Sequence, residues 1–179
     1  TIASHALSIF GDHQDVMACL QAGCSMLAEA SVQEVMDLAA VAHLVAIKGR
    51  VPFINFFDGF RTSHEIQKVE VMDYEDLRPL LDTKALDEFR HRALNPDHPV
   101  QRGSATNPDV YFQSREASNQ YYEAIPELVE ECFGEIAKIT GREHHLFDYY
   151  GAKDADRVIV AMGSVTQAAV EAADYLNAH

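Results

Sequence analysis

The chain has 179 residues, of which 47% are hydrophobic and 23% are charged, an ordinary balance for about one globular domain. Its 14 basic and 28 acidic side chains give a formal net charge of −14, which disfavours nucleic acids and anionic membrane surfaces as partners. No apolar run approaches the roughly 20 residues of a membrane-spanning helix, and the N-terminus has neither a signal-peptide pattern nor an initiator Met. We therefore expect a cytoplasmic protein, and a chain cut from a longer polypeptide.

The first quarter of the chain predicts two short elements. Residues 1–10 have a mixed pattern that fits a strand followed by a loop. A helix is expected to open within the polar run 11–15 and to reach about Ala22, where Gly23 ends it. A short strand at 25–29 follows.

A strongly apolar helix is predicted next. It begins at a capping box, in which Ser31 accepts a hydrogen bond from an N-terminal amide and Glu34 reaches back. The helix runs to about Lys48, and because it is apolar on almost every face we expect it to be buried. The apolar run 51–57 then predicts a strand buried on both faces. Strand, helix and strand with tight links indicate a parallel sheet with a right-handed crossover, so the fold class is α/β.

The middle of the chain predicts short helices and a long irregular segment. Asp73 and Asp82 are N-cap candidates for helices near 74–81 and 83–94. Residues 95–109 contain three prolines, a glycine and two asparagines, which indicates an extended loop or an arm lying on a neighbouring surface.

The last part of the chain predicts a long helical stretch and then a new strand-helix unit. Within the helical stretch 114–139, Pro126 is expected to begin a second helix, because proline is poorly tolerated inside one. Two strands and a closing helix follow, at 146–150, 157–162 and 164–178. The last strand-helix unit starts afresh after a turn at Gly151, and we place a domain boundary near residue 145.

The nine histidines do not have the spacing of a metal site. The adjacent pair at 144–145 directs its two rings differently on either a strand or a helix. His13 with Asp12 and Asp15 is a possible site, although Asp12 serves equally well as a helix N-cap. His43, inside the apolar helix, is expected to be a hydrogen-bonded core histidine.

Two further stretches are candidates for chemistry. His64 and Glu65 follow the second predicted strand, where open α/β sheets bind ligands, and have side chains suited to acid-base work. Packing in the loop and salt bridges with Arg61 or Lys68 are the favoured explanation of both. The pair at 163–164 offers free amides to a phosphate, with simple capping of the following helix as the default.

The three cysteines, Cys19, Cys24 and Cys132, are odd in number and lack CxxC spacing. A disulfide framework or an iron-sulfur ligand set is therefore not expected within this chain. They are predicted to be reduced and mostly buried.

Several long runs closely resemble pyruvate:ferredoxin (flavodoxin) oxidoreductases. These runs are SIFGDHQD at 8–15, FFDGFRTSHEIQK at 56–68, NPDVYFQ at 107–113 followed by REA at 115–117, and RVIVAMGS at 157–164. The resemblance covers the entire chain and implies a parent several times larger. It implies a partial thiamine diphosphate-binding fold: a parallel sheet with flanking helices in the later part of the pyrimidine-binding domain, residues 1–145. The helical and loop arm of that domain is residues 71–145, and residues 146–179 would begin a second, transketolase C-terminal-like α/β domain.

The resemblance also implies an activity for the parent. The family decarboxylates pyruvate on thiamine diphosphate, passes electrons through [4Fe–4S] clusters to ferredoxin or flavodoxin, and makes acetyl-CoA from CoA. It implies Mg²⁺ as a further cofactor and a homodimer as the assembly. The main catalytic groups, the diphosphate–Mg²⁺ site and the cluster cysteines lie outside this chain, so no catalytic or metal residue is assigned within it and the fragment alone is expected to be inactive.

Within the chain, the resemblance implies that residues 5–9 run near the cofactor pocket, with Leu7 and Ile9 as apolar wall residues. Asp12 and His13 would position the following helix, and residues 61–65 would meet a neighbouring domain or subunit. Two alternatives stay open: an oxidoreductase for another 2-oxoacid, and a non-catalytic α/β module for binding or assembly.

Overall fold

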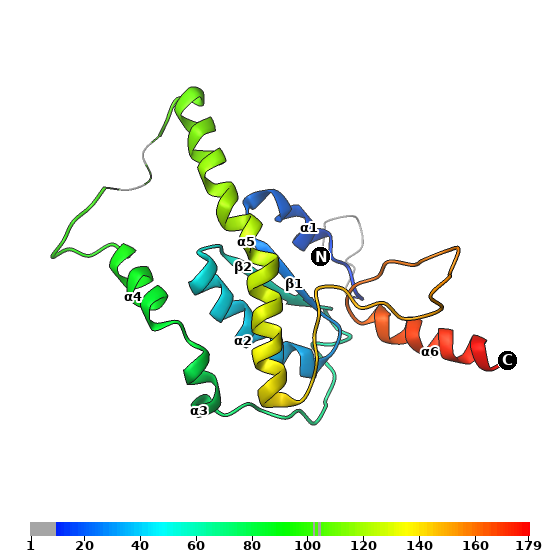
Figure 1. Ribbon diagram of the computed structural model, residues 1–179. Helices are drawn as coiled ribbons and strands as arrows, with labels where there is room; N and C mark the ends of the chain where they lie inside the picture. The colour runs from blue at the N-terminus through cyan, green and yellow to red at the C-terminus, as the bar shows by residue number, and fades with distance from the viewer. Residues whose placement is uncertain (1–9, 102, 104) are drawn as a thin grey trace.

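The computed structural model describes residues 10–101, 103 and 105–179 (Figure 1). The strand expected at the start of residues 1–10 falls almost wholly outside the described residues, as do Leu7 and Ile9.

A parallel two-stranded sheet lies at the centre of the fold. Strand β1 (Ser25–Glu29) pairs with β2 (Phe53–Phe57) in a register that runs from Ser25 beside Phe53 to Glu29 beside Phe57. Helix α2 (Val32–Gly49) connects them. The predicted strand-helix-strand unit and its parallel pairing are therefore confirmed.

The start of α2 has the predicted capping box, displaced by one residue on one side. The Ser31 hydroxyl accepts from the Glu34 amide at 3.2 Å, as expected. The Glu34 carboxylate accepts from the Ala30 amide at 2.6 Å, rather than from the amide of Ser31 itself. Both interactions satisfy donors at the helix start that have no partner within the helix.

One face of α2 is buried, not its whole circumference. Its buried residues include Leu38, Val41 and Val45, which pack toward the sheet and toward α5. His43 lies on the opposite, exposed side, where its Nδ1 is 2.7 Å from the Ala39 carbonyl oxygen. The expectation of a core histidine is therefore wrong, because this turn of the helix faces away from the packed layer.

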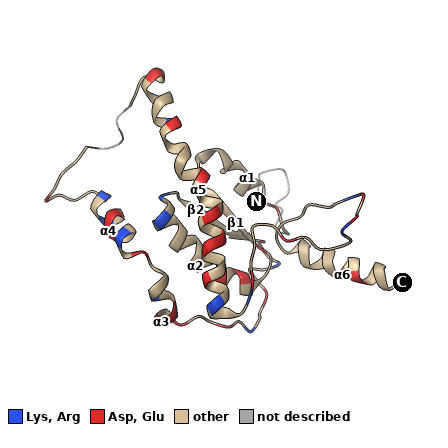
Figure 2. Ribbon diagram, in the orientation of Figure 1, with Lys and Arg blue, Asp and Glu red and all other residues tan. Residues whose placement is uncertain are grey.

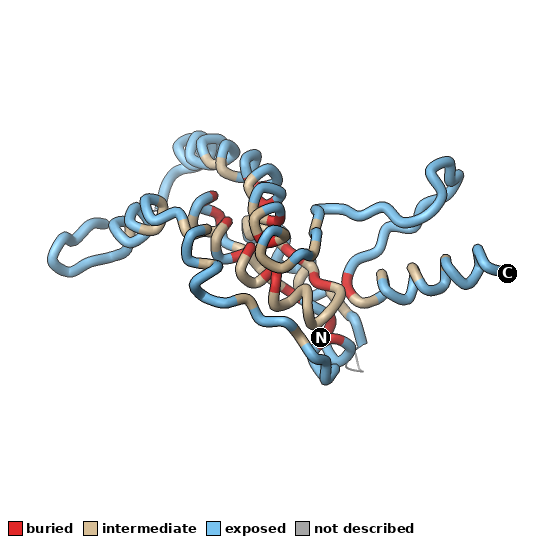
Figure 3. Tube along the Cα trace, turned by 60° about the horizontal axis from the view of Figure 1, so that its bottom comes forward, coloured by how far each residue is buried: buried red, intermediate tan, exposed pale blue. Residues whose placement is uncertain are grey.

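Helix α5 (Pro108–Thr140) forms the outer layer over α2 (Figures 1 and 3). It buries four side chains in the core, Ile125, Val129, Phe133 and Ile136. The helix is continuous through Pro126, so the prediction of a second helix starting there is wrong. The proline removes one backbone bond, yet the helix continues because the residues on both sides of it are held against α2.

The remaining elements lie around this core. Asp73 and Asp82 cap their helices by accepting from the amides of Glu75 and Ala85, as predicted. The loop that follows them extends away from the core (Figure 1). The other elements are α1 (Gln14–Ala18), η1 (Leu20–Ala22), α3 (Tyr74–Leu77), η2 (Arg78–Leu80), α4 (Thr83–Arg92) and α6 (Val165–Ala178).

The segments 146–150 and 157–162 are not strands, contrary to the prediction. Their apolar side chains are largely exposed; those of Ile159 and Val160 are 88% and 90% exposed. A strand needs a neighbour for its amides and carbonyls, and no described strand pairs with either segment. Helix α6 follows as predicted, with no buried residue of its own (Figure 3).

An ion-pair cluster fixes the segment after α5 to α2. The Arg142 guanidinium donates to both carboxylate oxygens of buried Asp37, at 2.7 and 2.9 Å, and to Glu70 at 2.6 Å. Burial opposes ionisation of Asp37, but hydrogen bonds from Arg142, His144 and Gln33 hold its pKa below the ordinary value. His145 lies 3.6 Å from Glu130 instead, so the two adjacent histidines do face different partners.

Acidic residues recur along the length of α5 (Figure 2). Of the helices among the described residues, none is both long enough and apolar enough to cross a bilayer.

Candidate functional site at the carboxyl edge of the sheet

Asp58 joins three distant parts of the chain just beyond the end of β2. Its Oδ1 lies 2.5 Å from His13 Nε2, at the start of α1. Its Oδ2 accepts from the Ser164 amide, also at 2.5 Å, at the start of α6. Because ligands of open α/β sheets bind beyond the carboxyl ends of the strands, this junction is the leading candidate site.

The charge on Asp58 fixes the proton on His13. Burial opposes ionisation of this carboxyl, but hydrogen bonds from Ser164 and His13 outweigh it and hold the pKa of Asp58 below its ordinary value. An ionised carboxylate only accepts hydrogen bonds, so the His13 Nε2 carries the proton and donates it. The other ring nitrogen, Nδ1, has no hydrogen-bond partner among the described residues. The His13 side chain keeps 15% exposure while that of Asp58 keeps 4%.

The approach of α6 to Asp58 requires a glycine. Gly163 has φ +76°, and a Cβ built there would fall 2.7 Å from Asp58 Oδ1. The amide of Ser164 is thereby engaged by a carboxylate, and the Ser164 hydroxyl makes no capping bond. Neither sequence interpretation of this pair is right: the helix start holds no free amide at Ser164 for a phosphate, and it is capped by Asp58 rather than by its own serine.

The turn after Asp58 carries an exposed group of aromatic rings. The ring of Phe60 stacks on His64 at a centroid distance of 5.0 Å, and the edge of Phe10 meets Phe60 at 4.8 Å. Phe60 has φ +67°, and its amide donates to the Ser63 hydroxyl at 2.8 Å. That hydroxyl also lies 2.8 Å from His64 Nδ1, so the turn is fixed by its own side chains.

The sequence candidates His64 and Glu65 are not brought together with the Asp58 junction by any hydrogen bond among the described residues. Glu65 accepts from Gln67 at 2.5 Å, and neither Arg61 nor Lys68 forms an ion pair with it in the described structure. The two predicted acid-base candidates therefore lie in a solvent-exposed turn, and the expected salt bridges are replaced by a local hydrogen bond.

Glu29 is a further candidate functional residue, which the sequence alone does not indicate. The side chain is completely buried at the end of β1, and neither carboxyl oxygen has a hydrogen-bond partner among the described residues. Burial raises its pKa to about 8, with a further increase from Glu34. The Oδ1 of nearby Asn55 is also buried without a partner. Only the tertiary environment shows this, because a glutamate at a strand end looks ordinary in sequence.

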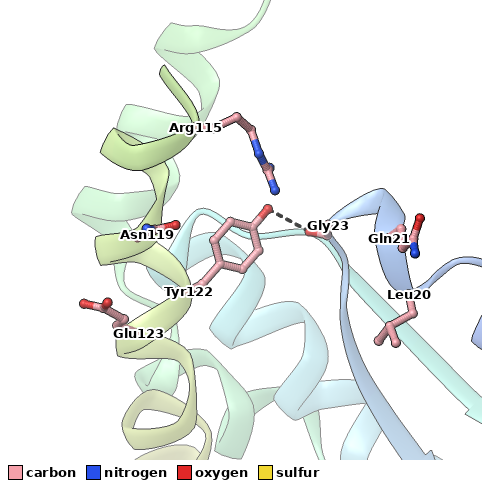
Figure 4. A pocket seen from close by; sticks show the side chains of 7 residues that line it. All are labelled: Leu20, Gln21, Gly23, Arg115, Asn119, Tyr122 and Glu123. Carbon is pink, nitrogen blue, oxygen red and sulfur yellow. Dashed lines mark hydrogen bonds between the residues drawn. The ribbon is translucent and has the colours of Figure 1, made fainter. Parts of the chain in front are cut away.

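A shallow groove of about 340 Å³ lies between η1 and the first half of α5 (Figure 4). Tyr122 crosses it and donates to the Gly23 carbonyl at 2.9 Å, while Arg115 extends along its upper side. A Cβ at Gly23 would lie 2.9 Å from that tyrosine hydroxyl, so the glycine permits the close contact. The groove is an open packing seam between the two helices and gathers no set of groups suited to catalysis.

The cysteines are only partly as predicted. All three are free thiols, but Cys19 is exposed, whereas Cys24 and Cys132 are half-buried. Burial raises the pKa of the Cys132 thiol to about 11, which leaves it protonated and unreactive near neutral pH. Within the described ranges, no group of His, Cys, Asp or Glu side chains is arranged to hold a metal ion.

Comparison with known proteins identifies the family. Residues 1–134 match the model of the pyruvate flavodoxin/ferredoxin oxidoreductase, thiamine diphosphate-binding family. The chain belongs to this family. It is 67% and 65% identical to pyruvate-flavodoxin oxidoreductases of Enterobacter agglomerans and Klebsiella pneumoniae, over 99% of this chain in each case. It is 61% identical to the pyruvate:ferredoxin oxidoreductase of Moorella thermoacetica over 98% of this chain. The chain spans about 15% of the length of each of these relatives.

The family binds thiamine diphosphate. The described residues at the carboxyl edge of the sheet fit the ring portion of this cofactor better than its diphosphate portion. The exposed aromatic rings of Phe10 and Phe60 lie at this edge, and the imidazole of His64 stacks on Phe60. Such a group suits contact with a heteroaromatic ring. The ionised Asp58 already occupies the Ser164 amide and would repel a diphosphate. The described residues therefore fit the ring portion, and a diphosphate requires groups from elsewhere.

Proposed function

We propose that the complete protein containing this chain oxidises and decarboxylates pyruvate with CoA. The products are acetyl-CoA and CO₂, and the electrons pass to flavodoxin or ferredoxin. The observation that supports this most is the 61–67% identity, across almost all of this chain, to relatives named as pyruvate oxidoreductases of these two kinds. The parallel sheet with flanking helices agrees with the thiamine diphosphate-binding family.

Thiamine diphosphate, when bound, stabilises the carbanion that forms as a 2-oxoacid loses CO₂. We propose that Leu7 and Ile9 contribute apolar wall to the pocket for its ring portion. Mg²⁺ and the [4Fe–4S] clusters belong to other parts of the polypeptide. This division agrees with the repulsion of a diphosphate by Asp58 and with the unreactive thiol of Cys132.

We also propose how the complete enzyme is organised and where it is located. The thiamine-binding domain continues to about residue 145, and residues 146–179 begin a transketolase C-terminal-like domain. Segments 146–150 and 157–162 would then be strands of that second domain. The complete enzyme is a cytoplasmic homodimer. The exposed apolar side chains of the second segment support this division, because they have no partner among the described residues that would cover them.

The direct test compares the complete enzyme with the 179-residue chain. Each is supplied with pyruvate, CoA, thiamine diphosphate, Mg²⁺ and oxidised flavodoxin or ferredoxin, and acetyl-CoA is quantified. Turnover is expected from the complete enzyme alone. A complete enzyme without turnover would refute the proposed function, and turnover by the isolated chain would refute the placement of the main catalytic groups elsewhere.

A closely related alternative is an oxidoreductase for another 2-oxoacid. Competition between pyruvate and 2-oxobutyrate or 2-oxoglutarate on the complete enzyme separates the two. Pyruvate is expected to have the highest kcat/KM.

A further inference from the structure

The buried Asp58 holds His13 in the manner of the carboxylate that orients a histidine in hydrolytic triads. Its Oδ1 is 2.5 Å from Nε2, and its other oxygen is fixed by the Ser164 amide, so the carboxylate cannot rotate freely. The imidazole is also confined by Phe56, whose ring meets it edge-on at a centroid distance of 5.4 Å. These two contacts hold the ring of His13 in one orientation.

The other ring nitrogen of His13, Nδ1, is the one suited to proton transfer. Nδ1 has no hydrogen-bond partner among the described residues and belongs to a side chain that remains partly exposed. The pair lies at the carboxyl end of β2, beside the aromatic rings of Phe10 and Phe60. A structural salt bridge would explain the contact with Asp58, but it gives no reason for an oriented, partner-free Nδ1 at the ligand edge.

We propose that His13 is a proton-transfer residue of the complete enzyme and that Asp58 is its positioning residue. This inference rests on the proposed function. Pyruvate, CoA thiol and two oxidised one-electron acceptors give acetyl-CoA, CO₂, two reduced acceptors and one proton. That proton comes from the thiol, whose S–H bond breaks as its sulfur bonds to the carbonyl carbon of pyruvate. The bond from that carbon to the carboxylate breaks, CO₂ leaves, and the two electrons of that bond pass to the two acceptors. His13 Nδ1 accepts the proton and releases it to water, while Asp58 stays ionised throughout.

The charged groups around the imidazole determine the expected pH dependence. Asp58 faces it from the end of β2, and the start of α6 acts through the same carboxylate. Asp12 and Asp15 lie beside it in sequence, and Phe56 contributes no charge. Asp58→Asn therefore removes the negative charge that is hydrogen-bonded to the imidazole.

The test uses the complete enzyme with three variants. His13→Gln keeps a side-chain amide that can donate to Asp58 but cannot exchange a proton. Asp58→Asn keeps the shape of the carboxyl without its charge. His43→Gln is the matched control, because it removes an exposed histidine on α2 that lies outside the candidate site.

His13→Gln is expected to lower kcat about 100-fold, within the usual range for loss of a general base. It should abolish the fall in kcat at acidic pH. Asp58→Asn should also lower kcat, because it removes the charged acceptor that orients the His13 ring, and His43→Gln should leave both kcat and its pH profile unchanged. The unfolding midpoint of the cofactor-free enzyme should be unaffected by His13→Gln.

A second readout does not depend on turnover. Diethyl pyrocarbonate should modify His13 in the cofactor-free enzyme, as detected by peptide mass spectrometry, and CoA with thiamine diphosphate should slow that modification. An unmodified His13, or a wild-type kcat and pH profile in His13→Gln, would overturn the inference. If His13→Gln unfolds, the modification experiment on the unaltered enzyme decides the matter: protection of His13 by CoA with thiamine diphosphate supports proton transfer at this site, and equal modification rates with and without them refute it. Absence of turnover in the unaltered enzyme would instead refute the proposed function.

Discussion

Glu29 is the residue whose ionisation should affect stability most clearly. The folded chain holds its carboxyl group in a fully buried position and raises its pKa from 4.5 to about 8. Between these two values the folded state keeps a proton that the unfolded state has lost. The free energy of unfolding should therefore fall as pH rises through this window, by up to about 1.4 kcal/mol per pH unit. The full stabilising contribution of protonated Glu29 to the free energy of unfolding is present below the unfolded-state pKa of 4.5.

The variant Glu29→Gln should remove this pH dependence. Glutamine has nearly the same shape and no proton to lose, so its advantage over the natural residue should grow between about pH 5 and about pH 8 and then level off. Urea unfolding midpoints across this range measure the difference. Glu127→Gln, at an exposed position on α5, is the control. Parallel curves for the two variants would show that Glu29 is ionised in the folded chain.

The most important contact of the candidate site is invisible to local sequence patterns. Asp58 looks like a turn residue that ends a strand, and it is one. Its partners His13 and Ser164 are 45 and 106 positions away, so no spacing rule connects them. The histidine and glutamate at 64–65 were predicted as candidates because they follow the end of a strand. That position puts them in an exposed turn and does not supply a buried partner.

At the scale of elements, Pro126 is the clearest conflict between local preference and tertiary packing. Proline lacks the amide that would bond to the Tyr122 carbonyl four residues earlier, and its ring crowds that carbonyl. Helix α5 nevertheless continues, because Ile125 and Val129 are both buried against α2 and its neighbours. Packing on the two flanking turns holds the helix together at a site where an isolated peptide would break.

The variant Pro126→Ala should therefore stabilise the chain. The restored hydrogen bond and relieved crowding favour the folded state by about 3 kcal/mol, partly offset by about 1 kcal/mol from the more flexible unfolded chain. Thermal unfolding followed by circular dichroism measures the net gain of about 2 kcal/mol. Ala117→Pro, at an exposed position of the same helix, should destabilise it instead. An unchanged midpoint for Pro126→Ala would show that α5 is already broken at this position in solution.

Elements were predictable wherever the signals that form them are local. Ser31, Asp73 and Asp82 each cap the helix expected of them, and the alternation of strand and helix gives the parallel pair. The strands expected at 146–150 and 157–162 fail for a different reason. Apolar, β-branched residues favour extended structure, but a strand is completed only by a neighbour, and the described residues provide none.

At the scale of the whole molecule, the exposed apolar surface indicates where further polypeptide belongs. Val158, Ile159 and Val160 are 62%, 88% and 90% exposed, in a chain whose net charge of −14 otherwise favours contact with water. The chain spans about 15% of the length of its relatives, so covering surface is available in proteins of this family. An uninterrupted run of three exposed β-branched residues is an edge that natural proteins normally cover.

We predict that residues 157–162 become a paired strand in the complete enzyme. Hydrogen exchange followed by mass spectrometry should show slow exchange for the amides of Val158, Ile159 and Val160 in the complete enzyme, and fast exchange in the isolated chain, because only paired amides are protected. Peptides from α2 are the internal control: their amides are bonded within the helix in both forms and should exchange slowly in both. If the 157–162 amides exchange equally fast in the two proteins while α2 stays protected, the segment is not a strand of a second domain. The boundary near residue 145 would then lose its structural basis.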